Sequence, residues 1–167
     1  MPTINGRACV VNGTPVDKVF SNGKQVYGRN LCIDTGQDFV VDDTANTGTQ
    51  GFNFHVFSLN QQLEVGDHIT VSANGTLTGR GDLSTYEVVL YNSYITAARG
   101  DSKRLTAGKI SSATLRVNNL NGAGNTVLII YAGNYSDTEG KKNVIHHLKV
   151  EKGDIATPWS PAPEDVM

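Results

Sequence analysis

The sequence predicts an all-β protein, in the form of an antiparallel β-sandwich preceded by a short β-meander. Gly accounts for 18 of the 167 residues. The β-branched and aromatic residues typical of strands recur, whereas Ala, Leu, Glu and Lys are sparse for a helical protein. Asn-Gly steps separate many short apolar segments, and these steps favour type I′ hairpin turns because both residues tolerate positive φ. They lie at Asn5-Gly6, Asn12-Gly13, Asn22-Gly23, Asn74-Gly75 and Asn121-Gly122.

The N-terminal region is expected to form a small unit of its own. Three short segments separated by turn signals predict a β-meander, at Arg7 to Val11, Val16 to Phe20 and Lys24 to Tyr27. Three short strands can hardly bury an apolar face of their own. We therefore expect residues 1–29 to attach the protein to a larger assembly or to form a homo-oligomer, and residues 30–167 to form the sandwich. Deleting residues 1–29 should leave the sandwich folded but impair assembly.

A polar segment follows, from Asp34 to Gly51, and its only apolar stretch, Phe39 to Val41, predicts one edge strand. The segment holds several carboxylates, including Asp42 and Asp43, whose oxygens are suitable calcium ligands. Their spacing does not resemble a loop that wraps a cation. We therefore predict a solvated acidic loop and no metal site.

The remaining strands are predicted from short apolar segments bounded by turns. They are Phe52 to Leu59, His68 to Ala73, Thr85 to Tyr91, Ala113 to Asn118, Thr126 to Ala132 and Asn143 to Glu151. Two segments alternate, which predicts one buried face and one face in water. The predicted buried sets are Ile69, Val71 and Ala73, and Val144, His146, Leu148 and Val150; the predicted exposed sets are Thr70 and Ser72, and Ile145, His147, Lys149 and Glu151.

The segment from Leu83 to Ala98 also permits a helix. Ser84 and Glu87 have the spacing of a capping box, and Leu83, Tyr86, Leu90 and Tyr94 follow a helical period. A strand is favoured because Val88 and Val89 are β-branched.

Charge and composition argue against several classes of partner. The net charge is −2 and the isoelectric point about 6.0, and no segment gathers Lys and Arg into the patch that nucleic acids or anionic membranes require. No run approaches the ~20 apolar residues of a membrane span, and the N-terminus lacks the pattern of a signal peptide. We expect no nucleic-acid and no membrane partner.

Catalytic signatures are missing from the sequence. It has no G-x-S-x-G elbow, H-E-x-x-H motif, C-x-x-C pair or P-loop. Adjacent strand residues point to opposite faces, so His146 and His147 cannot bind one metal ion together, and we expect His146 to be a hydrogen-bonded core residue. Cys9 and Cys32 are expected to be buried free thiols. The protein is therefore predicted to be no enzyme and to use no cofactor.

Two Arg-Gly-Asp sequences are interpreted as exposed turns. They begin at Arg80 and Arg99, and Gly beside charged residues is common in turns. We assign no adhesion function to them.

The C-terminal run VIHHLKVEKGDIATPWSPAPEDV, from Val144 to Val166, carries a specific motif. It resembles the ending shared by many carbohydrate-binding modules in tail and baseplate proteins of phages that infect Gram-positive bacteria. LEVGDHITVSANG, from Leu63, resembles a strand entry of the same modules, and KVFSNGKQVYGRNL, from Lys18, resembles N-terminal segments of phage tail proteins.

This resemblance implies a galactose-binding-like jelly roll. It also implies a location in the tail or baseplate of a virion, exposed outside the host cell, with other virion proteins and a host cell-wall or surface polysaccharide as partners. In such modules the last strand and its Pro-rich tail tie the chain end to the sandwich. Trp159 is accordingly expected to be an anchor packed on the sheet, between Pro158 and Pro161.

A saccharide presents hydroxyls and an apolar patch of C–H groups, so its receptor needs an exposed aromatic ring beside planar hydrogen-bonding side chains. Two loops supply that mixture. The candidate binding residues are Tyr91, Asn92, Tyr94, Arg99 and Asp101 in the first loop, and Asn134, Tyr135 and Asp137 in the second. Tyr94 and Tyr135 are the better candidates for exposed rings, since Tyr91 and Tyr131 lie in predicted strands and are expected to be half-buried. The sequence leaves open whether both loops lie at one end of the sandwich.

Two functions are consistent with these features. The first is a phage tail or baseplate accessory or receptor-binding protein that recognises a host surface saccharide without catalysis. The alternative is a purely structural tail, baseplate or decoration protein that makes only protein contacts.

Overall fold

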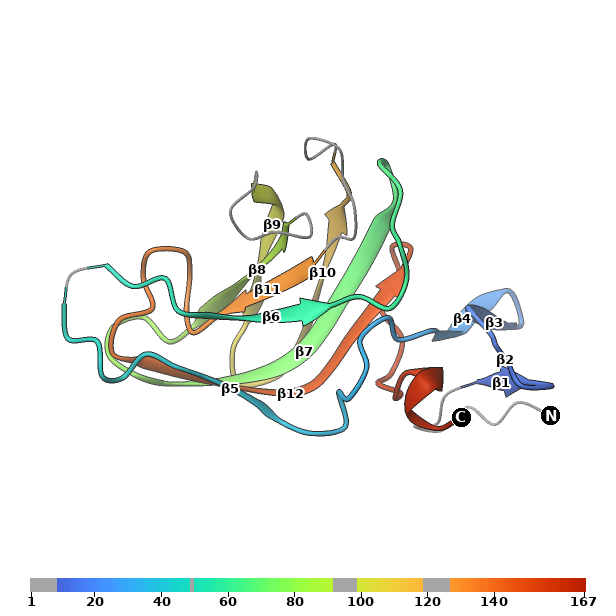
Figure 1. Ribbon diagram of the computed structural model, residues 1–167, viewed down its shortest axis with the longest axis horizontal. Helices are drawn as coiled ribbons and strands as arrows, with labels where there is room; N and C mark the ends of the chain where they lie inside the picture. The colour runs from blue at the N-terminus through green and yellow to red at the C-terminus, as the bar shows by residue number, and fades with distance from the viewer. Residues whose placement is uncertain (1–8, 49, 92–98, 119–126) are drawn as a thin grey trace.

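The computed structural model of the chain describes residues 9–48, 50–91, 99–118 and 127–167 (Figure 1). It confirms the all-β prediction, and the described part has a single 3₁₀ turn, at Pro163–Asp165. The strands are β1 (Val10–Val11), β2 (Thr14–Pro15), β3 (Lys18–Ser21), β4 (Lys24–Gly28), β5 (Phe39–Asp42), β6 (Phe54–Ser58), β7 (His68–Gly79), β8 (Thr85–Tyr91), β9 (Arg99–Thr106), β10 (Ile110–Arg116), β11 (Val127–Tyr131) and β12 (Lys141–Lys152). No helix of the described residues is long and apolar enough to cross a membrane.

Two four-stranded antiparallel sheets pack as a β-sandwich of the predicted jelly-roll class. Their strand orders are β10-β7-β12-β5 and β6-β11-β8-β9. β5 lies at the edge of its sheet, as expected. The predicted strand Thr85 to Tyr91 is β8, so the helical alternative is wrong for these residues; residues 92–98 lie outside the described part.

The main core lies between the two sheets. Apolar residues alternate along β7, β8, β10, β11 and β12, and the inward-facing ones are buried. Among them are Ile69, Val71, Tyr86, Val88, Leu90, Leu115, Leu128, Ile130, Ile145, Leu148 and Val150.

The Asn-Gly steps do not all form turns. Asn12-Gly13 and Asn22-Gly23 join β1 to β2 and β3 to β4, and all four residues have positive φ. Asn74-Gly75 was predicted as a turn, but it lies inside the twelve-residue strand β7. The Tyr86 ring occupies the space that a Cβ at Gly75 would need, so the missing side chain serves packing there. Asn5-Gly6 and Asn121-Gly122 lie outside the described residues.

Strand β9 was not predicted. Its sequence, RGDSKRLT, lacks an apolar alternation, and it forms because its backbone pairs with β8. The Arg-Gly-Asp sequence at Arg99 therefore begins a strand, contrary to the expected turn. The sequence at Arg80 follows the end of β7, and Asp82 there accepts a hydrogen bond from the Ser84 amide at 2.9 Å.

The alternation predicted for the last strand fails at its centre. The register of β12 against β7 shifts between His146 and Lys149, and His147 has a φ of 51°. This bulge adds a residue to one strand, so Ile145 faces the core together with Leu148 and Val150. His146 is partly exposed, with its Nδ1 2.7 Å from Asp38 Oδ1, so it is hydrogen-bonded but not a core residue as predicted.

One part of the outer face of the β10-β7-β12-β5 sheet is covered, whereas the sequence predicted a face in water. Thr70, Ser72, Lys149 and Glu151 are all buried. The cover comes from β4 and from the chain that follows β12, and both lie at the same end of the sandwich (Figure 1).

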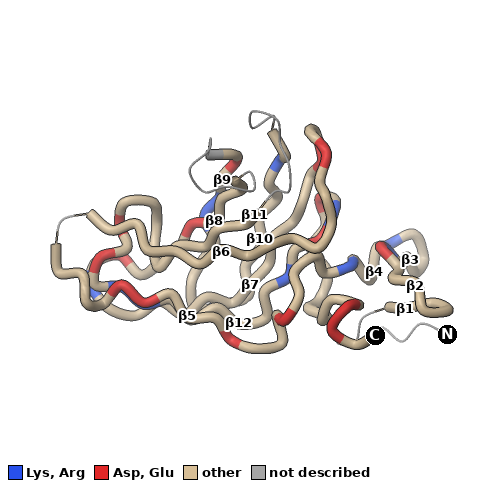
Figure 2. Tube along the Cα trace, in the orientation of Figure 1, with Lys and Arg blue, Asp and Glu red and all other residues tan. Residues whose placement is uncertain are grey.

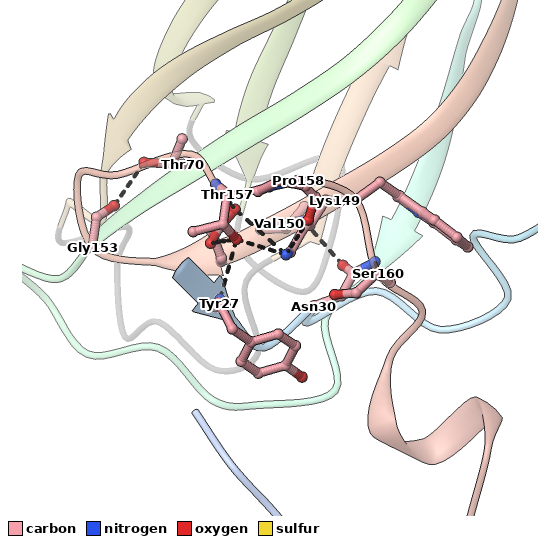
Figure 3. Close-up of polar contacts among 12 residues, drawn as sticks. Tyr27, Asn30, Thr70, Lys149, Val150, Gly153, Thr157, Pro158 and Ser160 are labelled. Atoms are coloured by element: carbon pink, nitrogen blue, oxygen red, sulfur yellow. Dashed lines mark hydrogen bonds and ion pairs between the residues drawn. The ribbon is translucent and has the colours of Figure 1, made fainter. Parts of the chain in front are cut away.

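Lys149 and Glu151 anchor the C-terminal tail (Figure 3). Lys149 Nζ donates to Thr157 Oγ1 and to the Pro158 carbonyl oxygen, both at 2.8 Å. Glu151 accepts hydrogen bonds from the Thr157 amide at 3.0 Å and from its hydroxyl at 2.8 Å. Burial outweighs the attraction of Glu151 and lowers the pKa of Lys149 to about 8, and burial also raises the pKa of Glu151. The hydrogen bonds of the two side chains therefore hold the tail on the sheet, while the burial of their charges lowers the net gain in stability.

Asn30 joins three distant segments beside this pair (Figure 3). Its Nδ2 donates to the Thr35 hydroxyl at 2.9 Å and to the carbonyl oxygens of Leu148 and Ser160, each at 3.1 Å. Its Oδ1 accepts from the amides of Cys32 and Val150. The side chain is fully buried.

The N-terminal strands form two separate two-stranded ladders, β1-β2 and β3-β4, instead of one three-stranded meander. β4 also contacts the sandwich: Tyr27 is buried, its ring centroid lies 5.3 Å from Lys149 Nζ, and the Gly28 amide donates to Thr157 Oγ1 at 3.1 Å. Cys9 and Cys32 are buried and free, as predicted, and burial raises the pKa of Cys32 to about 12.

The boundary between residues 29 and 30 stays a prediction. We expect a protein that lacks residues 1–29 to fold with a lower melting temperature than the full chain, because the cut removes Tyr27 from its buried position. Circular dichroism measures the melting temperature, and size-exclusion chromatography compares the assembly of the two forms. A truncated chain without a cooperative melting transition would show that β4 belongs to the sandwich core.

Candidate functional site

Four aromatic side chains lie together on the outer face of the β6-β11-β8-β9 sheet, which is the face opposite the main core. We call Phe52, Phe54, Tyr131 and Tyr135 the aromatic surface. Phe52 and Tyr135 meet edge to face with ring centroids 5.1 Å apart, and Tyr131 makes similar contacts with Tyr135 at 5.9 Å and Phe54 at 5.7 Å. Phe52 is 43 % exposed and Tyr135 45 % exposed, whereas Tyr131 is buried beneath them.

Strand alternation in β11 determines which side chains lie beneath the exposed rings of this surface. Val127, Ile129 and Tyr131 of β11 point outward and pack with Val89 and Tyr91 of β8 in a second apolar cluster. Tyr131 lies directly opposite Phe54 in the β11–β6 register.

Tyr135 is presented by a tight turn after β11. An isolated bridge joins Asn134 to Asp137, and Ser136 has a φ of 59°. The Tyr135 amide donates to Glu87 Oε2 at 2.8 Å. Because the backbone is held in this way, the ring of Tyr135 is positioned before any ligand arrives.

Polar side chains border the aromatic surface along β8 and β9. Glu87 is buried, and exposed Arg104 lies opposite it in the β8–β9 register, so both are on the outer face of the sheet. Thr85 Oγ1 accepts a hydrogen bond from Asn134 Nδ2 at 3.2 Å. An aromatic surface with planar hydrogen-bonding groups at its border has the chemistry that a sugar ring requires.

Of the three candidate residues in the second predicted loop, only Tyr135 belongs to the aromatic surface. Tyr135 forms its exposed part. Asn134 is buried against Thr85, and Asp137 Oδ1 lies 2.6 Å from the buried Lys141 Nζ. In the structure Asn134 and Asp137 shape the turn that carries Tyr135.

The first predicted loop leaves the opposite end of the sheet. Tyr91, the last residue of β8, pairs with Val127, the first residue of β11. Among the described residues, β9 and β10 lie between this loop and β11 in the chain, and the two loops leave the sheet at opposite ends. The Tyr91 side chain is buried, and its hydroxyl approaches the Tyr131 hydroxyl to 3.5 Å across the outer face. Tyr91 therefore packs on the same outer face as Tyr131 and contacts the buried part of the aromatic surface.

The other residues of the first loop lie elsewhere or outside the described part. Asp101 accepts hydrogen bonds from the amides of Ser102 at 2.9 Å and Arg116 at 3.0 Å, so its carboxylate binds the backbone of β10. Arg99 pairs with Tyr91 through its backbone. Asn92 and Tyr94 lie outside the described residues.

Sequence reasoning missed Phe52. The sequence pattern predicts Phe52 as the first residue of a strand, but β6 begins at Phe54. The Gly51–Asn53 segment is held by the Asn53 amide, which donates to Thr138 Oγ1 at 2.9 Å. No local pattern marks Phe52 as a neighbour of Tyr135, because that contact joins residues far apart in the sequence.

The acidic loop is held by hydrogen bonds within the protein. Asp42 accepts from the amide and the hydroxyl of Thr44, which lowers its pKa, and Asp43 accepts from the Thr138 hydroxyl at 2.6 Å. Among the described residues, no group of three His, Cys, Asp or Glu side chains could hold a metal ion. Asp and Glu are spread along the described trace together with Lys and Arg, and the charged residues between Arg29 and Arg80 are all acidic (Figure 2).

The fold and this surface define a class of protein, a jelly-roll β-sandwich with an aromatic surface on one sheet. Among solved structures, the tripod (BppUct-A-L) from the baseplate of bacteriophage Tuc2009 has a chain that is similar over 83 % of this chain and 60 % of that chain, with a TM-score of 0.51 and 14 % sequence identity. This likeness is one of fold, and it agrees with the resemblance seen in the C-terminal sequence. The chain spans less than two thirds of the length of the tripod chain.

Two carbohydrate-binding modules are also similar. One, described under "CBM4 structure and function", matches 75 % of this chain and 92 % of its own, with a TM-score of 0.39 and 9 % identity. The other is a mutant of a carbohydrate-binding module of family 29, which matches 93 % of this chain and 89 % of its own, with a TM-score of 0.41 and 9 % identity. No family model matches the chain, and a search of curated proteins finds no match.

Proposed function

We propose that the protein is a non-catalytic carbohydrate-binding module of a phage tail or baseplate, which binds a saccharide on the surface of the host cell. The observation that carries this proposal is the aromatic surface, where Phe52 and Tyr135 expose part of their rings in an edge-to-face pair next to β6 and β11. The fold shared with a phage baseplate tripod and the C-terminal motif support the location on the virion.

The mechanism is stacking supplemented by polar contacts. A sugar ring lies with its C–H face on an exposed ring, and its hydroxyls bind polar groups at the border of the surface. Arg104, opposite Glu87 in the β8–β9 register, and the hydroxyl of Tyr135 are the groups proposed for this role. Buried Tyr131 and Tyr91 keep the rings in place, so little side-chain entropy is lost on binding.

One shallow surface of this kind binds weakly, in about the millimolar to micromolar range. Many copies on one particle convert such weak contacts into firm attachment, because each further contact is made within an assembly already held at the cell. The homo-oligomer expected for the N-terminal strands would supply such copies.

Removal of either exposed ring should weaken cell binding without unfolding the protein. We expect Phe52→Ala and Tyr135→Ala each to weaken the affinity for host wall polysaccharide about 10-fold, because each removes one stacking contact. Fluorescent fusions added to host cells, and a glycan array of wall polysaccharides from Gram-positive bacteria, measure the effect. The melting temperatures should stay close to that of the wild type.

Phe20→Ala provides a matched control. Phe20 is an exposed aromatic residue of the β3–β4 ladder, far from the aromatic surface, so this variant should label cells as the wild type does. If the wild-type fusion labels no cells and the array gives no signal, the protein is the structural virion protein of the alternative hypothesis. Binding that survives in the Phe52→Ala/Tyr135→Ala double variant would move the site away from the aromatic surface.

A further inference from the structure

A pocket lies on the other side of the sandwich from the aromatic surface, on the outer face of the β10-β7-β12-β5 sheet. Its volume is about 400 Å³, which is within the usual range for small-molecule sites. Its lining includes Ser72, Ile110, Ser112, His147, Pro158 and Trp159. None of these residues belongs to the aromatic surface.

Trp159 forms one wall of this pocket. The indole is half-buried, its Nε1 donates to Thr35 Oγ1 at 3.4 Å, and its ring centroid lies 4.9 Å from that of His147. The sequence predicted Trp159 as an anchor packed on the sheet. The structure shows that it anchors the tail and also presents part of its ring to the pocket.

His147 reaches this position through the bulge in β12. Its φ of 51° lies in the left-handed region, which few residues other than Gly adopt, although His is among the more frequent of them. Bulges are frequent beside binding sites, where they change the direction of a side chain. The bulge here turns His147 out of the strand alternation and against the indole.

Ser72 and Ser112 supply hydroxyls to the pocket. They lie opposite each other in the β10–β7 register, and both line the pocket. Ser72 is 7 % exposed, whereas Ser112 is exposed on the neighbouring strand. Each hydroxyl can donate and accept hydrogen bonds, so the pair suits a ligand that carries hydroxyl groups.

The lining therefore combines two aromatic rings with hydroxyl groups and carries no carboxylate, Lys or Arg among the described residues. We propose that this pocket is a second saccharide site, which takes one neutral pyranose ring with its C–H face on Trp159 and its hydroxyls on Ser72 and Ser112. The class of ligand rests on the proposed function, whereas the site is separate from the aromatic surface.

The fluorescence of Trp159 tests this proposal directly, because it is the only Trp in the chain. The full-length protein is titrated with methyl α-glucopyranoside, methyl β-galactopyranoside and N-acetylglucosamine, each to about 50 mM, a range that covers weak single-site binding. We expect a saturable change in emission with at least one of these sugars. Glycerol at the same concentrations controls for bulk effects of a polyol that has no ring.

Variants assign the signal to the pocket. Ser72→Ala and Ser112→Ala should each raise the dissociation constant several-fold, up to about 10-fold, because each removes one hydrogen bond to the sugar. Ser21→Ala, at an exposed serine of β3, should leave the titration unchanged. A response that neither pocket variant weakens, or one that glycerol reproduces, would overturn the proposal.

The Phe52→Ala/Tyr135→Ala double variant separates this site from the proposed function. It should keep the saturable fluorescence change while losing its affinity for cells. If all three sugars leave the wild-type emission unchanged although cell binding depends on Phe52 and Tyr135, the second site is refuted and the proposed function stands. If the fluorescence responds but cell binding does not depend on those rings, the pocket stands alone.

Discussion

Replacing Lys149 with Met should lower the free energy of unfolding by about 3–5 kcal/mol, because it leaves the carboxylate of Glu151 buried without its cation. Both side chains are fully buried, with Lys149 Nζ 4.0 Å from Glu151 Oε2. The substitution also removes the hydrogen bonds that Lys149 donates to Thr157 and Pro158. Urea denaturation at pH 7 measures the change.

A second substitution distinguishes charge from packing. Adding Glu151→Gln to Lys149→Met removes the unpaired charge but keeps an acceptor for Thr157, so we expect it to recover at least about 1 kcal/mol. Lys142→Met, on the same strand but partly exposed, should change stability by less than about 0.5 kcal/mol. If Lys149→Met is as stable as the wild type, the buried pair does not hold the tail.

The pH dependence of stability has a defined sign. The pKa of Lys149 is lowered from 10.5 to about 8 in the folded protein, so between these pH values the unfolded chain binds a proton that the folded protein does not. The contribution of this group to stability therefore rises with pH across that interval. Relative to Lys149→Met, the wild type should gain stability as the pH is raised from 8 to 10.5.

Replacing Asn30 with Ala should lower the free energy of unfolding by more than about 3 kcal/mol, since each buried partner left without a hydrogen bond costs about 1–3 kcal/mol. The amides of Cys32 and Val150 and the carbonyl oxygens of Leu148 and Ser160 all lose Asn30 as a partner. Because these groups belong to three segments, the loss should also loosen the C-terminal tail. Hydrogen exchange of the Val150 amide, compared with that of Ile129 in the other sheet, tests this second effect.

Asn118→Ala serves as the control for Asn30. Asn118 follows β10 and is exposed, and its replacement should change stability by less than about 0.5 kcal/mol. Equal losses in the two variants would show that the hydrogen bonds of Asn30 contribute no more than those of a surface amide.

The two sites relate differently to the C-terminal tail. The pocket uses Trp159 of the tail as a wall, so a loosened tail should weaken the proposed second site. The aromatic surface is built from β6, β11 and the Tyr135 turn, on the other sheet. The Asn30→Ala variant should therefore keep its binding through Phe52 and Tyr135 in the folded fraction.

The sequence by itself determined the fold class and most strands. Alternation of apolar residues and the turns at Asn12-Gly13 and Asn22-Gly23 are local signals, since side-chain direction and positive φ depend on near neighbours. β8 was predicted to the residue, and β11 within one residue at each end. The exposed position of Tyr135 was expected for the same local reason, because the residue follows a strand in a polar turn.

Only the tertiary structure decided which polar residues are buried and which aromatic residues meet. Lys149 and Glu151 lie on a face that the strand period assigned to water, but β4 and the tail cover it. The bulge at His147 changed the faces of Val144 and Ile145 and brought an imidazole to Trp159. Phe52 met Tyr135, and Asn30 joined Ser160, across long stretches of chain. Such contacts arise from how the sheets and the tail pack, and a periodic pattern in one segment carries no information about the segment that will cover it.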